Sequence, residues 1–89
     1  MAVYKYYSLV DWSVEDNVYL VSFPDIENCF TFGDTLSKAI DMAKDALGSI
    51  LAVEEEQGRY IPKPSPARMI KIPEGASLIH IVVDTKDYE

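Results

Sequence analysis

The chain contains one cysteine, Cys29, among its 89 residues. A lone cysteine cannot close an internal disulfide, and it cannot build the cysteine clusters that hold zinc. The motifs GxGxxG, GxxxxGK(S/T), HExxH and CxxC are absent, as is the serine elbow of hydrolases. The sequence therefore predicts no cofactor, and we expect Cys29 to be a small buried residue in a reducing compartment.

Basic residues are also scarce. There are 8 lysines and arginines against 15 aspartates and glutamates, which gives a formal charge of −7. Proteins that follow nucleic-acid backbones carry the opposite sign of charge. We therefore expect no direct contact with nucleic acid. An acidic exterior would steer a basic protein partner towards the chain, but solubility alone accounts for many acidic surfaces, so charge by itself does not identify a partner.

Long apolar runs are missing as well. No stretch reaches the roughly 18 to 20 apolar residues of a membrane span, and the N-terminus lacks the pattern of a signal peptide. With 48% apolar and 26% charged residues, the composition is that of a folded domain. We expect one domain over residues 1–89, in the cytoplasm and without a membrane contact.

The first part of the chain carries three strand patterns. Val3–Val10 is rich in aromatic and β-branched residues, and Val18–Phe23 and Cys29–Phe32 are shorter extended runs. The polar connection between the first two holds Trp12, which either covers an end of the sheet or, if exposed, is a candidate binding anchor. We expect these strands to pair in antiparallel order.

One long amphipathic helix is predicted to follow, capped by Asp34 or Thr35 at its start and by Gly58 after its end. Its apolar positions recur at steps of three and four residues, which places them on one stripe. They are Leu36, Ala39, Ile40, Ala43, Leu47, Ile50 and Leu51. We interpret Gly33 as the source of backbone freedom for the turn into the helix, and Gly48 as a point of close backbone approach.

The remainder contains the proline-rich connector Ile61–Pro66 and the strand pattern Ser77–Asp84. Because Leu78–Val83 is almost continuously apolar, we expect that strand to be interior and covered on both faces. Ala67–Ile72 leaves room for a further short strand. The order β-β-β-α-β is typical of an α+β fold with two layers, one sheet and one helix.

Acidic residues are the only catalytic resource in the sequence. A two-metal nuclease needs several carboxylates that converge from different elements, and Asp11, Asp25, Asp34 and Asp84 are the candidates. Two of them stand at a turn and a helix start, where aspartate serves local hydrogen bonds, and the others lie at strand ends. His80 has no carboxylate or second histidine near it in sequence. We therefore predict no enzymatic activity.

The segments Phe23–Ile26 and Cys29–Leu36, with Ala39 after them, resemble the HicB antitoxin family of bacterial type II toxin–antitoxin pairs. Further matching positions are Tyr4, Gly58, Ile61–Ser65, Val83, Asp84 and Tyr88, so the resemblance covers essentially the whole chain. Two positions depart from the pattern: Asn28 replaces the usual glycine, and Lys38 replaces a common acidic residue.

The resemblance implies a partial, degenerate RNase H-like fold without ribonuclease activity. It implies a HicA-like toxin as partner, a small basic protein that cleaves messenger RNA and whose basic surface the acidic domain would cover. Many family members carry a C-terminal DNA-binding domain. We expect none within this chain, which stops about where that domain would begin, and we expect the chain to form a dimer or a higher homo-oligomer.

Two acidic patches are candidates for the toxin contact. The corner patch comprises Asp16, Asp25, Glu27 and Asp34, and the helix-end patch comprises Glu54, Glu55 and Glu56. Two other hypotheses remain open. One is a stand-alone interaction or oligomerisation module whose sheet edge pairs with a second copy, and the other is a residual metal-dependent nuclease.

Overall fold

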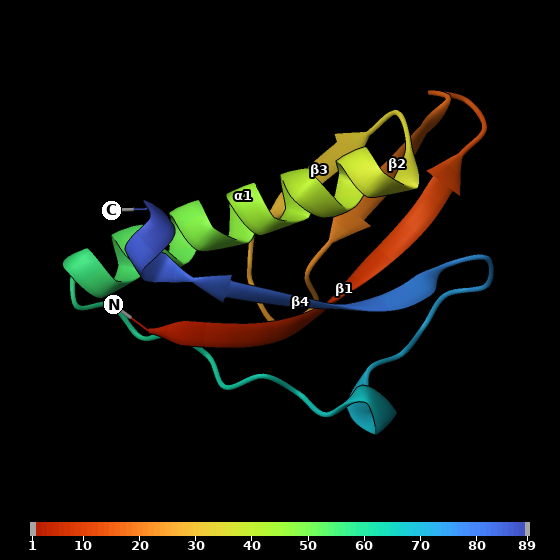
Figure 1. Ribbon diagram of the computed structural model, residues 1–89. Helices are drawn as coiled ribbons and strands as arrows, with labels where there is room; N and C mark the ends of the chain where they lie inside the picture. The colour runs from red at the N-terminus through yellow and green to blue at the C-terminus, as the bar shows by residue number, and fades with distance from the viewer. Residues whose placement is uncertain (1, 89) are drawn as a thin grey trace.

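Four strands form one antiparallel sheet in the computed structural model, which describes residues 2–88. The strands are β1 (Val3–Ser13), β2 (Val18–Ser22), β3 (Phe30–Gly33) and β4 (Ser77–Asp84), in the order β3-β2-β1-β4. The helix α1 (Leu36–Glu56) covers one face of the sheet, and the 3-10 helices η1 (Ala67–Met69) and η2 (Thr85–Tyr88) precede and follow β4 (Figure 1). The predicted two-layer α+β fold and its element order are confirmed.

Alternation along β1 determines which face of the sheet α1 covers. Tyr6, Ser8 and Val10 are buried in the core, whereas the residues between them lie on the helix-free face. The buried hydroxyls are satisfied, because Tyr6 donates to the carbonyl oxygen of Pro62 and Ser8 donates to that of Ile79 at 2.9 Å. β1 is therefore the central strand on which the other elements assemble.

The expectation that the last strand is interior and covered on both faces is wrong. β4 pairs only with β1 and forms an edge of the sheet. Ile81 and Val83 are buried beneath α1, but His80 and Val82 on the other face are exposed. The His80 ring stacks on the Tyr7 ring, with the ring centroids 4.4 Å apart. A long apolar run identifies a strand, but it does not specify how many neighbours the strand has.

The predicted strands also differ from the structure in their extent and in their number. β1 continues beyond Val10 to Ser13, because Trp12 pairs with Tyr19 of β2. The two rings are arranged edge to face, with their centroids 4.8 Å apart. Trp12 is consequently a partly exposed strand residue, and the loop after β1 is short. The segment Ala67–Ile72 forms no strand among the described residues; it begins with η1, whose backbone bonds are local.

The cap and the apolar stripe of α1 largely follow the sequence pattern. Thr35 is the N-cap, since its hydroxyl accepts from the Lys38 amide at 3.1 Å, and Gly58 follows the helix with φ +66°. The buried helix residues are Ala39, Ala43, Leu47, Gly48, Leu51 and Ala52. Leu36, predicted to be on the stripe, is 43% exposed because it lies at the helix start, near the end of the sheet.

Both interpreted glycines occupy positions of close approach. A Cβ on Gly33 would lie 2.4 Å from the backbone nitrogen of Ala39, and Gly33 does not have a positive φ. Its role is therefore packing of β3 against α1 and not backbone freedom. A Cβ on Gly48 would lie 2.3 Å from the ring of Tyr88 in η2, so the close neighbour of this glycine is a side chain.

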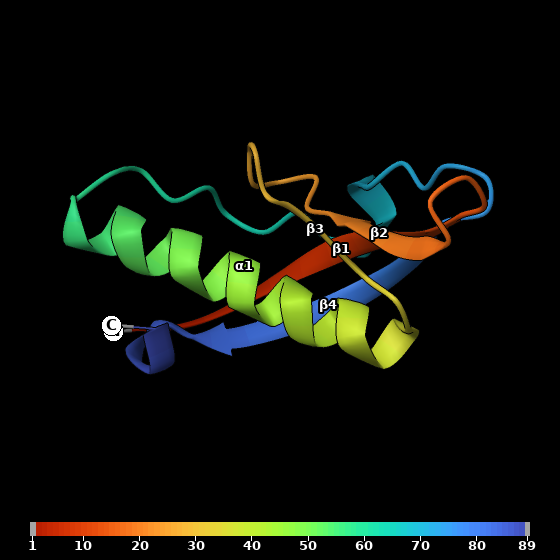
Figure 2. The same cartoon turned by 90° about the horizontal axis from the view of Figure 1, so that it is seen from above.

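After α1 the connector runs alongside the β2–β3 loop before it reaches η1 (Figure 2). Cys29, at the end of that loop, is buried as expected, and its burial raises the pKa of the thiol to about 11. No helix within residues 2–88 is long and apolar enough to cross a membrane.

Candidate interaction surfaces

The seven acidic residues proposed for partner binding lie at two ends of the sheet. Asp16 and Asp34 flank one end, because β2 begins after Asp16 and β3 ends before Asp34. Asp25 and Glu27 lie in the loop that joins β2 to β3, at the opposite end. The corner patch is therefore divided, and its Asp25–Glu27 half lies beside the C-terminal end of α1, with the helix-end patch.

Asp25 has a structural role within the fold. Its carboxylate accepts from the backbone amide of Ser65 at 2.8 Å and from the Ser65 hydroxyl at 2.7 Å. These two charge-assisted bonds fasten the β2–β3 loop to the proline-rich connector. Each carboxylate oxygen of Asp25 thus accepts one bond from within the fold.

Glu55 also forms contacts with other elements of the fold. The pKa of Glu55 is lowered to about 2, with hydrogen bonding to the Thr85 hydroxyl as the largest cause, and the Tyr4 hydroxyl, which donates at 2.8 Å, contributes to the same shift. Burial and the same Glu55 contact raise the pKa of Tyr4 to about 12. Glu55 thus connects α1 to β1 and to the start of η2.

This contact makes the stability of the fold dependent on pH. The folded-state pKa of Glu55 is depressed, so its stabilisation is present above the ordinary value of 4.5 and is lost as the pH falls towards 2. In thermal unfolding followed by circular dichroism, Glu55→Gln should lower the midpoint near neutral pH, and the difference from wild type should shrink below about pH 4. Glu56→Gln, a change of equal charge at an exposed neighbour, is the control. A Glu55→Gln deficit that stays constant down to about pH 2 would contradict this assignment.

Glu27 and Glu54 come together although they belong to different predicted patches. Both line a hollow of about 230 Å³ with an apolar floor that includes Ile26 and Ile50. The Glu54 carboxylate lies 3.8 Å from the Arg59 guanidinium, a partly exposed ion pair of small energetic value. We call this hollow the Glu27–Glu54 pocket. Glu56, the last member of the helix-end patch, is exposed.

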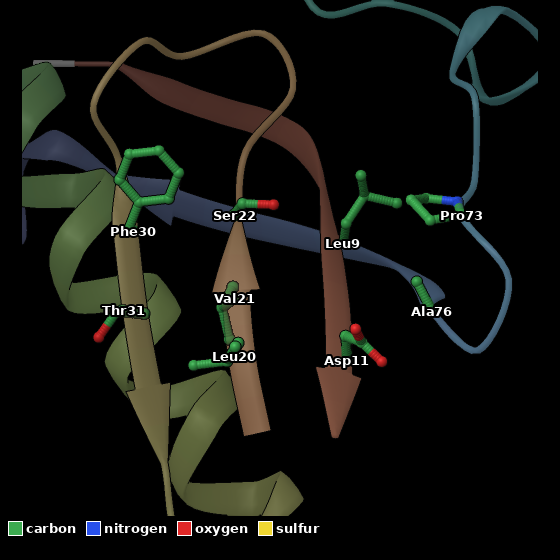
Figure 3. A pocket seen from close by; sticks show the side chains of 9 residues that line it. All are labelled: Leu9, Asp11, Leu20, Val21, Ser22, Phe30, Thr31, Pro73 and Ala76. Carbon is green, nitrogen blue, oxygen red and sulfur yellow. The ribbon is translucent and has the colours of Figure 1, made fainter. Parts of the chain in front are cut away.

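A further surface, on the helix-free face of β2 and β3, was not predicted from the sequence. Leu20, Phe30 and Phe32 are 42%, 73% and 59% exposed, and strand register places them on the same face. Figure 3 looks onto this face, with α1 behind the strands and with Leu9 and Pro73 beside the same hollow. The alternation of Phe30 and Phe32 could have indicated that both side chains lie on one face. A short apolar strand is equally consistent with burial in the core, so the pattern did not predict an exposed surface.

The four aspartates considered for a nuclease site do not converge. Asp11 and Asp84 lie near opposite ends of β1, eight residues apart in strand register, or about 26 Å. Asp25 is bonded to Ser65 in the β2–β3 loop, and Asp34 lies at the other end of β3. Within residues 2–88, no three His, Cys, Asp or Glu side chains gather in a way that could hold a metal ion.

Comparison with known proteins identifies the family. The profile of a family described as HicB-like antitoxin of bacterial toxin–antitoxin system matches residues 6–88. Antitoxin HicB 1 of Photorhabdus laumondii is 45% identical over 53 residues, which cover 60% of this chain and 34% of that protein. This chain therefore spans about a third of the length of that relative.

Solved structures share the fold. A chain of a toxin–antitoxin complex from Streptococcus pneumoniae has a TM-score of 0.88 at 23% identity, over 97% of this chain and 72% of that chain. A chain of the HicA3 and HicB3 toxin–antitoxin complex has a TM-score of 0.70 at 26% identity, over 91% of this chain and 99% of that chain. With the profile match over nearly its whole length, the chain belongs to the HicB-like antitoxin family of bacterial toxin–antitoxin systems.

Proposed function

We propose that this chain is a non-enzymatic antitoxin domain that binds a HicA-like toxin and covers its basic, RNA-binding surface. The observation that carries the proposal is the family match over residues 6–88. The formal charge of −7 supports it, because a negative exterior attracts the surface with which a toxin would hold RNA. The likeness to a chain of the HicA3 and HicB3 toxin–antitoxin complex also supports the proposal.

The proposal predicts binding that weakens with salt. In calorimetric titration with the purified HicA-like protein encoded beside this gene, we expect a complex whose dissociation constant rises about tenfold between roughly 50 mM and 300 mM salt. The same toxin should lose its RNA cleavage as the complex saturates. Absence of a complex at the lower salt, both by calorimetry and by size-exclusion chromatography of the mixture, with both proteins folded by circular dichroism, would exclude the proposal.

Self-association is the second candidate function, and one feature of the sheet favours it. β4 is an edge strand of eight residues whose outer side carries unpaired backbone groups, and Val82 on its helix-free face is exposed. Pairing of two β4 edges would give a dimer that is compatible with toxin binding. The mass from light scattering, measured on the samples of the titration, distinguishes monomer from dimer.

A further inference from the structure

The apolar surface of Leu20, Phe30 and Phe32 is continuous with three hollows that share its side chains. A hollow of about 320 Å³ includes Leu20, Phe30 and Asp11, and one of about 330 Å³ includes Leu20, Phe32 and Asp16. A third, of about 190 Å³, includes Phe32 and Asp34. The shared residues show that the hollows form one surface, which we call the β2–β3 face.

The β2–β3 face has an apolar centre and a charged rim. Asp11, Asp16 and Asp34 supply three carboxylates to the rim, and Lys38 is the one basic residue among those that line the three hollows. Protein interfaces commonly have this anatomy, in which aromatic side chains at the centre are surrounded by polar groups. Exposed aromatic side chains beside one another on a small domain indicate a contact surface.

We propose that the β2–β3 face is where this chain binds its basic protein partner, an inference that rests on the proposed function. Phe30 and Phe32 would insert between apolar side chains of the partner, and the three rim carboxylates would meet its lysines and arginines. A second copy of this chain is the poorer occupant. It would place three carboxylates against three others, and each chain carries a charge of −7.

The edge of the sheet adds to this surface. β3 is the edge strand next to β2, and the third hollow passes around it to Met42 of α1. An edge strand presents backbone groups that an extended segment of a partner can pair with. The partner can therefore reach the aromatic side chains and the strand edge from the same side.

The Glu27–Glu54 pocket is the competing acidic site, and two observations weigh against it. An internal cation, Arg59, already lies 3.8 Å from Glu54, so an incoming cation would compete with it. The pocket is smaller than either of the two larger hollows of the β2–β3 face. Its exposed aromatic residue, Tyr60, provides a variant that separates the two sites.

The test is titration of variants with the purified HicA-like protein encoded beside this gene. Phe30→Thr and Phe32→Thr remove the apolar centre and keep a β-branched side chain, and each should raise the dissociation constant about 30-fold. Their thermal midpoints should stay near that of wild type, because both rings lie mostly in water. Val3→Thr, an exposed valine on the same helix-free face at the start of β1, is the matched control, and it should bind as wild type does.

A double variant that leaves the apolar centre intact tests the rim. Asp16→Asn with Asp34→Asn should slow association and flatten its salt dependence, while dissociation changes little. If the Phe variants bind as wild type and Tyr60→Thr binds weakly, the contact lies at the Glu27–Glu54 pocket and the inference is overturned. A wild-type dimer that Phe32→Thr converts to monomers without loss of toxin binding also overturns it. Failure of wild type to bind would instead reject the proposed function.

Discussion

Gly33→Ala is expected to destabilise the fold by about 3 kcal/mol, near the upper end of what overpacking costs. The added Cβ would lie 2.4 Å from the nitrogen and 2.7 Å from the Cα of Ala39. These are backbone atoms of the first turn of α1, where the Ala39 amide donates to the Thr35 carbonyl oxygen at 2.9 Å. They cannot swing aside as a side chain can, so β3 and α1 must separate.

Thermal unfolding gives the measurement. For a domain of this size about 3 kcal/mol corresponds to a drop in the midpoint of roughly 12 to 24 °C. Gly58→Ala is the control, since Gly58 has φ +66° and nothing lies within 4 Å of the position of its Cβ. That change should cost only about 1 kcal/mol of backbone strain. Equal losses in the two variants would show that the approach of β3 to α1 is not rigid.

The effect of Gly48→Ala on the free energy of unfolding is expected to change sign when Tyr88 is replaced. In the wild-type chain the new Cβ would lie 2.3 to 2.6 Å from ring atoms of Tyr88 and would push the ring off α1. In a Tyr88→Ala background that obstacle is gone, and alanine in a helix interior should stabilise by about 1 kcal/mol relative to glycine. We therefore expect Gly48→Ala to be destabilising by about 1 kcal/mol in the first background and stabilising by about as much in the second.

The measurement is urea unfolding of wild type, the two single variants and the double variant. This double-mutant cycle should give a coupling free energy of about 2 kcal/mol between positions 48 and 88. Ser49→Ala, at the neighbouring exposed helix position, serves as the control and should have the same small effect in both backgrounds. A Gly48→Ala change that is destabilising to the same extent without Tyr88 would mean that the glycine serves something other than the docking of η2.

Local patterns in the sequence were sufficient for the elements themselves. The stripe of α1, its start at Thr35 or Asp34 and its end before Gly58 depend on residues a few positions apart, and Thr35 proved to be the cap. Asn28, in the β2–β3 loop, has φ +61°, a conformation that asparagine adopts more readily than most residues.

Contacts between segments far apart in the chain could not be predicted from the sequence. Asp25 was predicted to face a partner because it stands in an exposed-looking turn, but its bonds go to Ser65, 40 positions away. Glu55 was assigned to an acidic patch because it belongs to the acidic run at the helix end, on the side predicted to face solvent, but its contact with Tyr4 spans 51 positions. The placement of β4 at an edge likewise depends on pairing across the sheet. Which surface binds the partner remains a prediction for all seven acids.

The adjacency of Ala2 and Thr85 has a mechanical consequence. The Thr85 amide donates to the Ala2 carbonyl oxygen at 2.9 Å, next to the first pairs of the β1–β4 ladder, so both ends of the described chain lie side by side (Figure 1). A force applied between them loads the cross-strand bonds one pair at a time, like a zipper, and not all together in shear. Force applied between Ala2 and Thr85 would therefore separate β4 from β1 progressively, beginning at the Val3–Asp84 pair.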